Sequence, residues 1–460
     1  MGLFVVAAGL TIGLRPLADN SFFTHLSTGR LILEHGSVPS QDPYTFTAAG
    51  EPWVVQSWLA SWLYATVEAV FGITGLRLLM GAVAALLAGL MWRLAAPAEA
   101  LVIRLCIAGL AVAVGGELWA ERPFMLGLVA MALAALCAEG RLDPRWLLPV
   151  GWIWANVHGS FPLGLAYLAV VALGRRMDGG SPLLELRALR WLAAGLVTGA
   201  ASPVGPRLLT FPVELLRRQD LLSHVIEWRA PTFDSFSQRA FVVQLTLAIL
   251  LLVRRPSYRA GLVVTVFGAA ALLGARNLSV ASLVFIPAMA SSAPLLGTLR
   301  SAQRSRLAPH LGVVGLAVLV LLGTARLGQR DFELRGYPVD ALAHLEALGV
   351  DTTIQRLATQ DIVGNFQELV YGAQGRVFYD DRFDMFPDEV SAAHLALIDV
   401  TPDVRARLDE HAIDLVLWSR TGAITQRLVA DPDWRVLYLD ERAVVLCRRD
   451  ADVGGNVGEC

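Results

Sequence analysis

The chain contains no lysine: all 38 of its basic residues are arginines, and 40 acidic residues balance them. Charged residues make up only 17% of the 460 positions, whereas a typical soluble domain has about 25%. The formal net charge of −2 lacks the basic surplus that binding to nucleic acid requires. This shortage of charge, together with 55% hydrophobic residues and a mean hydropathy of +0.54, indicates a polytopic α-helical membrane protein.

Cysteine is also scarce, with four residues in the whole chain. Cys106 and Cys137 lie in apolar runs, Cys447 lies in an expected strand, and Cys460 is the last residue. Their spacing fits neither a zinc site nor a disulfide framework, so we expect small buried side chains. No glycine-rich phosphate loop, Ser-His-Asp set or Cys-His nucleophile is recognisable in the sequence. We therefore predict no metal and no cofactor.

Apolar stretches that could cross a bilayer recur through the first 326 residues. They lie at about 2–17, 73–94, 98–116, 123–139, 145–157, 161–175, 187–203, 239–253, 259–275, 277–293 and 309–326. The pair at 145–157 and 161–175 is short against the ~20 residues of a span and could instead form one broken helix. We predict about eleven transmembrane helices, the first of them a retained anchor and not a cleaved signal peptide.

The arginines between these stretches alternate between rich and poor loops, as the positive-inside rule requires. The loops expected inside contain Arg93, Arg104, Arg141, Arg145, Arg175, Arg176, Arg187, Arg190, Arg254, Arg255, Arg259, Arg300, Arg304 and Arg306. This orientation places the first loop (18–72), His158 and the residues after about 327 outside the cytoplasm, in a multi-pass inner-membrane protein. The loop 204–238 conflicts with it, because four arginines would lie on its outer side: Arg207, Arg217, Arg218 and Arg229.

The last 130 or so residues have a different composition, with shorter apolar runs and more Asp, Glu and Arg. Short helical and strand patterns alternate there, which is typical of a small α/β domain. We expect helices at Val339–Leu348 and Asp403–Ala412, and strands at Gly375–Tyr379, Ile413–Trp418, Trp434–Leu439 and Ala443–Arg448. Two domains are therefore predicted: a transmembrane domain at 1–326 with its first external loop 18–72, and an extracytoplasmic α/β domain at 327–460.

The first loop is unusually polar for its surroundings and is the main candidate for a functional site. Two juxtamembrane helices are expected in it, at Phe22–Glu34 and Pro52–Phe71. Asp19 could act as a general base for an incoming hydroxyl, or it could cap the first helix. Asp42 could bind substrate, although Asp42-Pro43 is also good turn chemistry. His25 could bind phosphate or simply lie at the membrane interface.

Four further candidates lie near the expected outer face. Glu121 could supply a second acid, and Arg122 could bind substrate, but Arg122 could equally pair with Glu121 or with Glu117, four residues before it. His158 ends an apolar run, where a polar side chain needs a partner such as phosphate. Arg276 has no acid near it in sequence and is a candidate phosphate ligand. The acidic run Asp380, Asp381 and Asp384 is better explained as a solvated turn than as a metal site.

The first loop also carries a specific motif, Asp19-x5-His25-x3-Gly29-Arg30-x2-Leu33-Glu34-His35-Gly36-x-Val38-Pro39-x2-Asp42-Pro43-Tyr44-x-Phe46-Thr47. This motif resembles a large bacterial family of polytopic proteins that is similar to the GT-C class of glycosyltransferases. The resemblance continues through Arg122-Pro123, Trp154-Ala155-Asn156-x-His158-Gly159, Glu227-Trp228, Arg276, Asn365 and Val377-Phe378-x-Asp380-x-Arg382. It covers nearly the whole chain.

The resemblance implies an inverting glycosyltransferase of GT-C-like fold. The donor would be a polyprenyl-phosphate sugar, and the acceptor an envelope glycan, lipid or protein on the outer face of the membrane. Asp19 matches the position of the catalytic acid, and Arg276 and His158 would hold the phosphate. Ser21 and Gln56-Ser57 stand where relatives often carry ionisable residues. These departures keep a second hypothesis open, a non-catalytic carrier or scaffold; a transporter lacks support, because no inverted repeat is visible.

Overall fold

The computed structural model describes residues 1–216, 226–293, 307–454 and 460. Its chain divides into two compact units. The helical unit consists of Met1–Leu17 and Gln56–Asp331, and the mixed unit consists of Ala18–Val55 and Phe332–Cys460. Five arginines discussed above lie outside the described residues: Arg217, Arg218, Arg300, Arg304 and Arg306.

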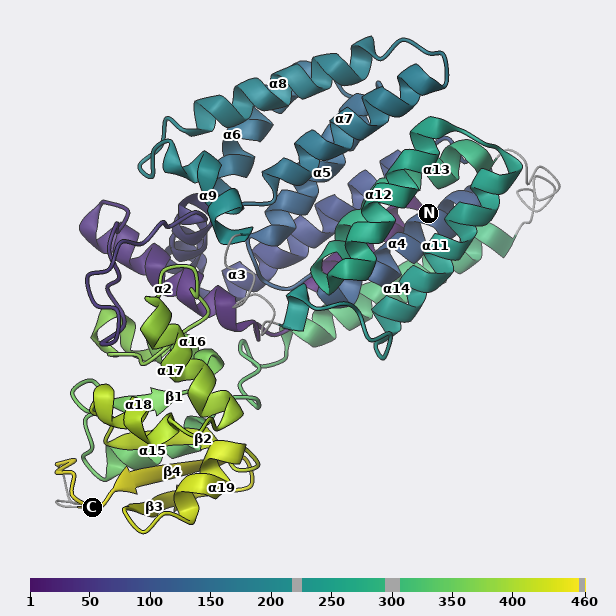
Figure 1. Cartoon of the computed structure of the whole chain (residues 1–460). Helices are drawn as coiled ribbons and strands as arrows, with labels where there is room; N and C mark the ends of the chain where they lie inside the picture. Colours follow the sequence, from purple (N-terminus) through teal and green to yellow (C-terminus); the bar gives the residue numbers. More distant parts are fainter. Residues whose placement is uncertain (217–225, 294–306, 455–459) are drawn as a thin grey trace. The chain divides into compact units, whose positions relative to one another are not determined.

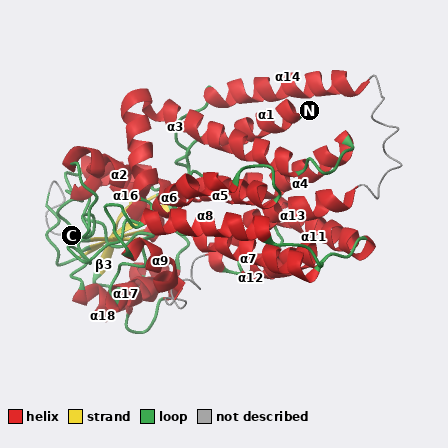
Figure 2. Cartoon of the chain, turned by 90° about the horizontal axis from the view of Figure 1, so that it is seen from above, coloured by secondary structure: helices red, strands yellow, loops and turns green. Residues whose placement is uncertain are grey.

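The helical unit is built of helices that follow the apolar runs of the sequence (Figures 1 and 2). Its α-helices are α1 (Gly2–Gly13), α3 (Trp58–Leu94), α4 (Leu101–Leu118), α5 (Phe124–Ala138), α6 (Leu147–Val157), α7 (Phe161–Met177), α8 (Leu183–Gly199), α9 (Arg207–Leu216), α11 (Phe236–Arg254), α12 (Tyr258–Leu273), α13 (Leu278–Ser292) and α14 (Leu307–Leu327). Short 3₁₀ helices are η1 (Pro144–Trp146), η2 (Ile226–Trp228) and η3 (Ala275–Asn277). Helix α1 packs on α3 and α14, α4 packs on α11 and α13, and α7 packs on α8 and α12.

Each expected apolar run falls on a helix, but most of these helices are short. Among the described residues, three are long and apolar enough to cross a membrane: α3, α4 and α11. Shorter apolar helices are Gly2–Gly13, Phe124–Ala138, Tyr258–Leu273 and Gly312–Leu327. A helix of 11 residues such as α6 is only about 16 Å long, whereas a bilayer core is about 30 Å thick. The expected number of about eleven crossings is therefore not confirmed, and the physical reason is helix length.

Helix α3 joins two elements that were expected to be separate. It begins at Trp58 and continues to Leu94 through a kink at Gly72, whose φ of 66° and ψ of −171° are not helical. A positive φ suits glycine because it has no Cβ. The expected juxtamembrane helix Pro52–Phe71 therefore begins later than predicted, and it runs on into the span expected at 73–94.

Buried Arg77 of α3 ties three helices of this unit together. Its guanidinium donates to the carbonyl oxygen of Leu14, which directly follows α1, at 3.0 Å. It also donates to the carbonyl oxygen of Arg326 on α14. It also pairs with Asp331 at 3.2 Å. Because a buried charge without partners is costly, these contacts fix the ends of α1 and α14 against α3.

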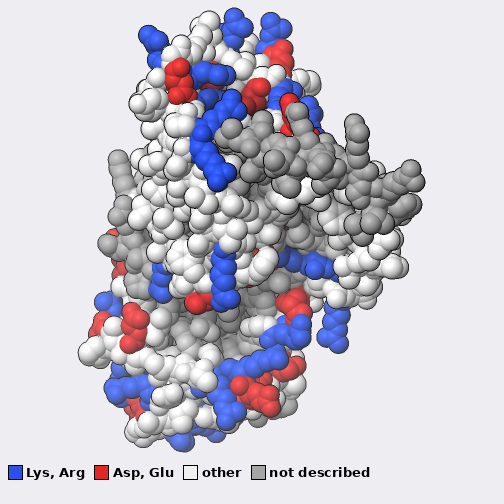
Figure 3. Space-filling view, turned by 90° about the vertical axis from the view of Figure 1, so that its right-hand side faces the viewer, with Lys and Arg blue, Asp and Glu red and all other residues white. Residues whose placement is uncertain are grey.

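The surface of the helical unit is largely apolar. Large exposed hydrophobic side chains occur on several of its helices, for example Leu86, Val197, Val243, Leu250 and Leu273. In Figure 3 charged side chains gather at the top end of this unit, and a broad surface below them carries few charges. Exposed apolar area of this extent is rare on soluble monomers, and it agrees with a membrane protein.

The mixed unit contains a four-stranded sheet in the order β1-β2-β4-β3. Its strands are β1 (Leu357–Thr359), β2 (Leu415–Ser419), β3 (Trp434–Leu439) and β4 (Ala443–Arg448). Its helices are α2 (Asn20–His35), α15 (Val339–Ala347), α16 (Asp361–Tyr371), α17 (Asp388–Asp399), α18 (Val404–Glu410), α19 (Ala423–Val429) and the 3₁₀ helix η5 (Gly372–Gln374). Strand β1 is parallel to β2, and the other pairs are antiparallel. The terminal hairpin has the predicted bounds. The strand expected at Gly375–Tyr379 is instead an isolated bridge between Val377 and Thr45, and β1 was not foreseen.

The first loop belongs mostly to the mixed unit, whereas the predicted boundary grouped it with the transmembrane part. Residues 18–55 group with 332–460, not with 1–326. The helix expected at the membrane interface, α2, packs on α16. Its Phe23 is fully buried and contacts the rings of Phe332, Tyr337 and Phe366. The apolar face of α2 is thus covered by protein, and burial of large aromatic side chains drives this association.

Two cysteines also depart from expectation. Cys447 of β4 and Cys460 form a disulfide across a sequence separation of 13 residues, although their spacing gave no such prediction. Cys137 is a buried free thiol, as expected, whereas Cys106 is free and exposed.

Candidate functional site

Asp19 caps helix α2. Its Oδ1 accepts a hydrogen bond from the backbone N–H of Phe22 at 3.3 Å, and its own backbone is extended. The capping role that the sequence left open is therefore present. His25 lies six residues further along the chain, on α2, and is half-buried.

Asp42 is a buried ion-pair partner at a turn. Its Oδ2 accepts from the backbone N–H and the hydroxyl of Thr45 at 2.9 and 2.5 Å. Its Oδ1 lies 2.7 Å from the Arg382 guanidinium. Because all these partners belong to the mixed unit, Asp42 fixes the first loop to the C-terminal part of the chain.

Arg382 is the centre of a buried cluster of charges. It pairs with Asp42 at 2.7 Å, Asp380 at 2.6 Å and Glu368 at 3.6 Å, and its exposed side-chain fraction is 6%. The rings of Tyr44 and Trp53 lie 4.9 and 4.4 Å from its guanidinium carbon. Such cation–π contacts add to the attraction of the carboxylates.

The cluster shifts the ionisation of its members. Burial raises the pKa of Glu368 well above its ordinary value, the charge of Asp380 adds to this effect, and Arg382 opposes it. Burial lowers the pKa of Arg382, but the charges of Asp380, Glu368 and Asp42 outweigh it and hold that pKa above its ordinary range. Like charges at close quarters cannot all remain ionised. The cluster therefore favours the protonated form of Glu368 and the charged form of Arg382.

A second polar group surrounds Asp381. The hydroxyl of Ser21 donates to Asp381 Oδ2, and the amide of Asn365 donates to its Oδ1 at 2.7 Å. Asn20 donates to the amide oxygen of Asn365 at 3.2 Å. Burial and the charge of Asp381 raise the pKa of Asp361 to about 6. The residues of the first loop and the acids of the C-terminal part thus share one hydrogen-bond network.

Sequence reasoning missed most of this arrangement. Asp380 was assigned to a solvated turn, but it is fully buried and ion-paired. Glu368 was not singled out at all. The available signal was the Asp380-x-Arg382 spacing within the resemblance, since an acid and an arginine two residues apart can pair across a tight turn.

In the helical unit, Glu121 and Arg122 lie between α4 and α5 and have different partners. Glu121 is buried and pairs with Arg15 at 3.1 Å. Arg122 pairs with Glu227 of η2. Glu117 accepts from the backbone N–H of Ser237 at 2.9 Å. Besides the pairing of Arg122 with Glu121 or Glu117 that the sequence suggested, all three residues thus have partners elsewhere in the helical unit.

Arg276 lies next to the same group of residues. Its guanidinium carbon is 4.2 Å from the ring of Trp228, and Ala275 donates to the carbonyl of Arg229 at 2.9 Å. Glu227 and Arg122 are both close enough to act on its charge. The segment 226–229 comes from the loop that conflicted with the arginine pattern, and it brings Glu227 to Arg276.

His158 is held against the start of α5. Its ring lies 5.2 Å from that of Phe124, and its Nδ1 accepts from the backbone N–H of Ser160 at 3.0 Å. Phe124 follows Arg122 by two residues. The four predicted residues of this unit, Glu121, Arg122, His158 and Arg276, are therefore gathered around the α4–α5 connection.

The neighbouring amides help to fix this region. Buried Asn156 accepts from the indole N–H of Trp58 at 2.7 Å and donates to the carbonyl of Trp152 at 2.8 Å. Gln56 donates to the carbonyl of Ala155 at 3.3 Å. Within the described part of the chain, no group of three or more His, Cys, Asp or Glu side chains is placed to hold a metal ion.

Comparison with known proteins gives a structural match but no match in sequence. No protein-family model fits the chain, and no curated protein matches it. Its fold is similar to the crystal structure of the Archaeoglobus fulgidus oligosaccharyltransferase in the apo form, with a TM-score of 0.51 and 10% identity. The match covers 91% of this chain and 69% of the archaeal chain. This similarity confirms a GT-C-like fold, and it does not extend to the bacterial family that the motifs resemble.

Proposed function

We propose that this protein is an inverting membrane glycosyltransferase. It transfers a sugar from a polyprenyl-phosphate donor to an acceptor of the cell envelope, a glycan, lipid or protein, on the extracytoplasmic face of the inner membrane. The observation that carries the proposal is the gathering of Arg122, His158 and Arg276 in a chain with a GT-C-like fold. The lipid, the sugar and the acceptor are those that the resemblance implies, and the GT-C-like fold supports a glycosyltransferase in general.

The donor phosphate binds at the α4–α5 connection. Arg122 and Arg276 lie around the carboxylate of Glu227, and an incoming phosphate competes with that carboxylate for their N–H donors. Guanidinium groups suit this role because they bind phosphate oxygens through two parallel hydrogen bonds. His158 adds a further donor. In the reaction these groups stabilise the negative charge that develops on the departing lipid phosphate.

Asp19 acts as the general base. Its carboxylate takes the proton of the acceptor hydroxyl, the acceptor oxygen bonds to the anomeric carbon, and the bond from that carbon to the phosphate oxygen breaks. Attack from the opposite side inverts the anomeric centre. His25 and Asp42 belong to the same first loop and support the substrate site, Asp42 through its ion pair with Arg382.

The mixed unit guides the acceptor outside the cytoplasm. The Cys447–Cys460 disulfide supports this location, because disulfides persist in oxidising compartments. We keep about eleven crossings as part of the proposal, with the bilayer locally thinner around the shorter helices. Labelling of single introduced cysteines with a membrane-impermeant thiol reagent tests the orientation of each loop.

The first experiment compares wild type with Asp19→Asn in lipid, using radiolabelled polyprenyl-phosphate mannose, glucose and arabinose with a crude envelope acceptor. Asparagine caps a helix about as well as aspartate, so this change removes the base and keeps the cap. We expect transfer to fall by about 10²–10⁴-fold with donor binding unchanged. Asp143→Asn is the matched control, since Asp143 also caps a helix, at η1, and should leave transfer intact. Equal sugar transfer by Asp19→Asn and wild type would refute the role of Asp19 as general base.

A non-catalytic lipid-linked-sugar carrier or scaffold is the second candidate. It is favoured by Ser21 and Gln56, which stand where relatives often carry ionisable groups and which make ordinary structural hydrogen bonds here. Donor binding by the wild type without transfer from any of the three donors would select this function.

A further inference from the structure

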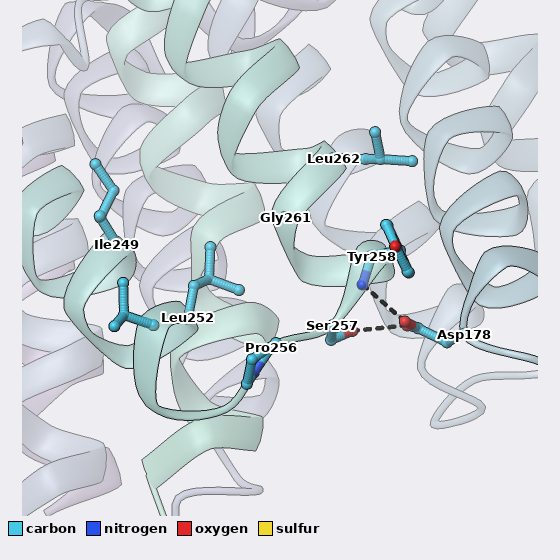
Figure 4. A pocket seen from close by; sticks show the side chains of 9 residues that line it. Asp178, Ile249, Leu252, Pro256, Ser257, Tyr258, Gly261 and Leu262 are labelled. Atoms are coloured by element: carbon cyan, nitrogen blue, oxygen red, sulfur yellow. Dashed lines mark hydrogen bonds between the residues drawn. The ribbon is translucent and has the colours of Figure 1, made fainter.

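A groove of about 590 Å³ lies on the surface of the helical unit, where α11 ends and α12 begins (Figure 4). Its wall is formed mainly by the apolar side chains of Ile249, Leu252, Val253, Tyr258 and Leu262. Its size is within the range of about 300–1,000 Å³ that is usual for small-molecule sites. None of these residues takes part in the proposed transfer of sugar.

The wall of this groove is open to its surroundings. The exposed fractions are 47% for Ile249, 72% for Val253 and 57% for Tyr258. Helix α11, which carries the first two, is one of the three helices long and apolar enough to cross a membrane. Hydrocarbon chains of the bilayer are therefore the natural partner of this wall.

Asp178, an acid that lines the groove, is engaged by hydrogen bonds from the start of α12. Asp178 accepts from the Ser257 hydroxyl at 2.7 Å and from the backbone N–H groups of Tyr258 and Arg259 at 2.7 and 3.0 Å. It thereby caps α12 and balances the positive end of that helix.

Four exposed arginines flank the groove. Arg254 and Arg255 directly follow the wall residue Val253, and Arg175 and Arg176 end α7 just before Asp178. Two of them make further contacts: Arg175 pairs with buried Glu185 at 3.3 Å, and Arg255 donates to the carbonyl of Ser291 at 2.7 Å. The positive-inside pattern of the sequence assigns all four to the cytoplasmic side. Basic sites between membrane helices on that side attract anionic lipid headgroups.

We propose that this groove binds one anionic phospholipid. An acyl chain lies along the apolar wall, and the phosphate is held by the arginines at its rim. The apolar wall requires a hydrocarbon chain, so inorganic phosphate alone does not satisfy the site. The positive rim in turn favours an anionic headgroup over a zwitterionic one. This binding is independent of the proposed sugar transfer.

Gly261 offers a direct way to close the groove. It belongs to the groove wall, and a Cβ added there would meet no atom within 4 Å. A phenylalanine at this position therefore fills the groove without forcing the backbone to move. Gly109 on α4 is equally open and lies outside the groove, so Gly109→Phe is the matched control.

The test uses the purified full chain in neutral detergent, titrated with phosphatidylglycerol and, separately, with phosphatidylcholine, with retained lipid counted by native mass spectrometry. We expect wild type and Gly109→Phe to retain one phosphatidylglycerol, and Gly261→Phe to lose it. The double variant Arg254→Gln/Arg255→Gln should weaken phosphatidylglycerol binding by about ten-fold or more and leave phosphatidylcholine unaffected. Exposed arginines elsewhere on the same side, in Arg187→Gln/Arg190→Gln, should have no effect.

Two outcomes overturn the proposal. Wild-type retention by Gly261→Phe shows that lipid binds elsewhere. Equal affinity of the wild type for the two lipids shows that the arginine rim does not select the headgroup. The rim variants change only exposed side chains, so they give an answer even where Gly261→Phe fails to fold.

Discussion

In the mixed unit Arg382 is buried among three carboxyl groups, whereas in the helical unit Arg122 pairs with Glu227 at a partly open site. The exposed side-chain fractions make the contrast plain: 6% for Arg382 against 27% for Arg122 and 41% for Glu227. Buried charges with fixed partners have little freedom to bind anything else. The open pair can exchange one anionic partner for another. The first arrangement is therefore suited to holding a fold, and the second to binding a ligand.

The same contrast explains why the first loop is so polar. Asp42 and the Asn20–Ser21 pair lie in the mixed unit with Arg382, Asn365 and Asp381, where they make fixed hydrogen bonds. Polarity in this loop is thus partly structural. A structural role for Asp42 is compatible with catalysis nearby, because a rigid loop keeps Asp19 in one position.

The largest expected effect comes from breaking the buried cluster. Arg382→Leu leaves the charges of Asp42 and Asp380 buried without their cation, and loss of one partner of a buried ion pair costs about 3–5 kcal/mol. We expect a clearly lower thermal midpoint for the purified chain and faster hydrogen exchange in β2 and β4. Arg335→Ala is the control, because Arg335 forms an exposed pair with Glu333 and should change the midpoint little. An unchanged midpoint in Arg382→Leu would show that the cluster does not hold the unit together.

A smaller effect is expected at the open site. Arg276→Gln removes one of the two cations around Glu227, and hydrogen bonds to charged groups contribute about 1.5–3 kcal/mol. Affinity for a polyprenyl-phosphate sugar should therefore fall by about ten-fold or more, while the thermal midpoint changes little. Filter binding of radiolabelled donor measures the first quantity. Arg145→Gln alters an exposed arginine beyond the far end of α5 and should bind as wild type does. A large loss of stability with unchanged donor affinity would reverse the contrast between the buried cluster and the open site.

Sequence patterns predicted the helices and strands better than the tertiary contacts between them. Apolar periodicity located the helices and the terminal hairpin, because these depend on neighbouring residues. It could not show that Asp42 meets Arg382, since their sequence separation of 340 residues carries no local signal. The gathering of Arg122, His158 and Arg276 was foreseen as a set of residues but not as a geometry. Their partner Glu227 comes from a separate loop, and only tertiary packing brings it there.

The smallest expected effect is on the pH dependence of stability. It distinguishes the hydrogen-bond network around Asp381 from the buried cluster around Arg382. The pKa of Asp361 is raised from 3.8 to about 6, by burial first and by Asp381 second. A raised pKa in the folded state means that folding favours the protonated form. The stability contributed by Asp361 is therefore complete below about pH 4 and is lost as the pH rises through about 6. Asp361→Asn stays neutral at every pH, so its thermal midpoint should fall less than that of wild type between pH 4 and 7. Parallel curves for the two proteins would show that Asp361 is ionised throughout. In that case the Asp381 network, like the open arginine pair, would be accessible to solvent and not closed like the Arg382 cluster.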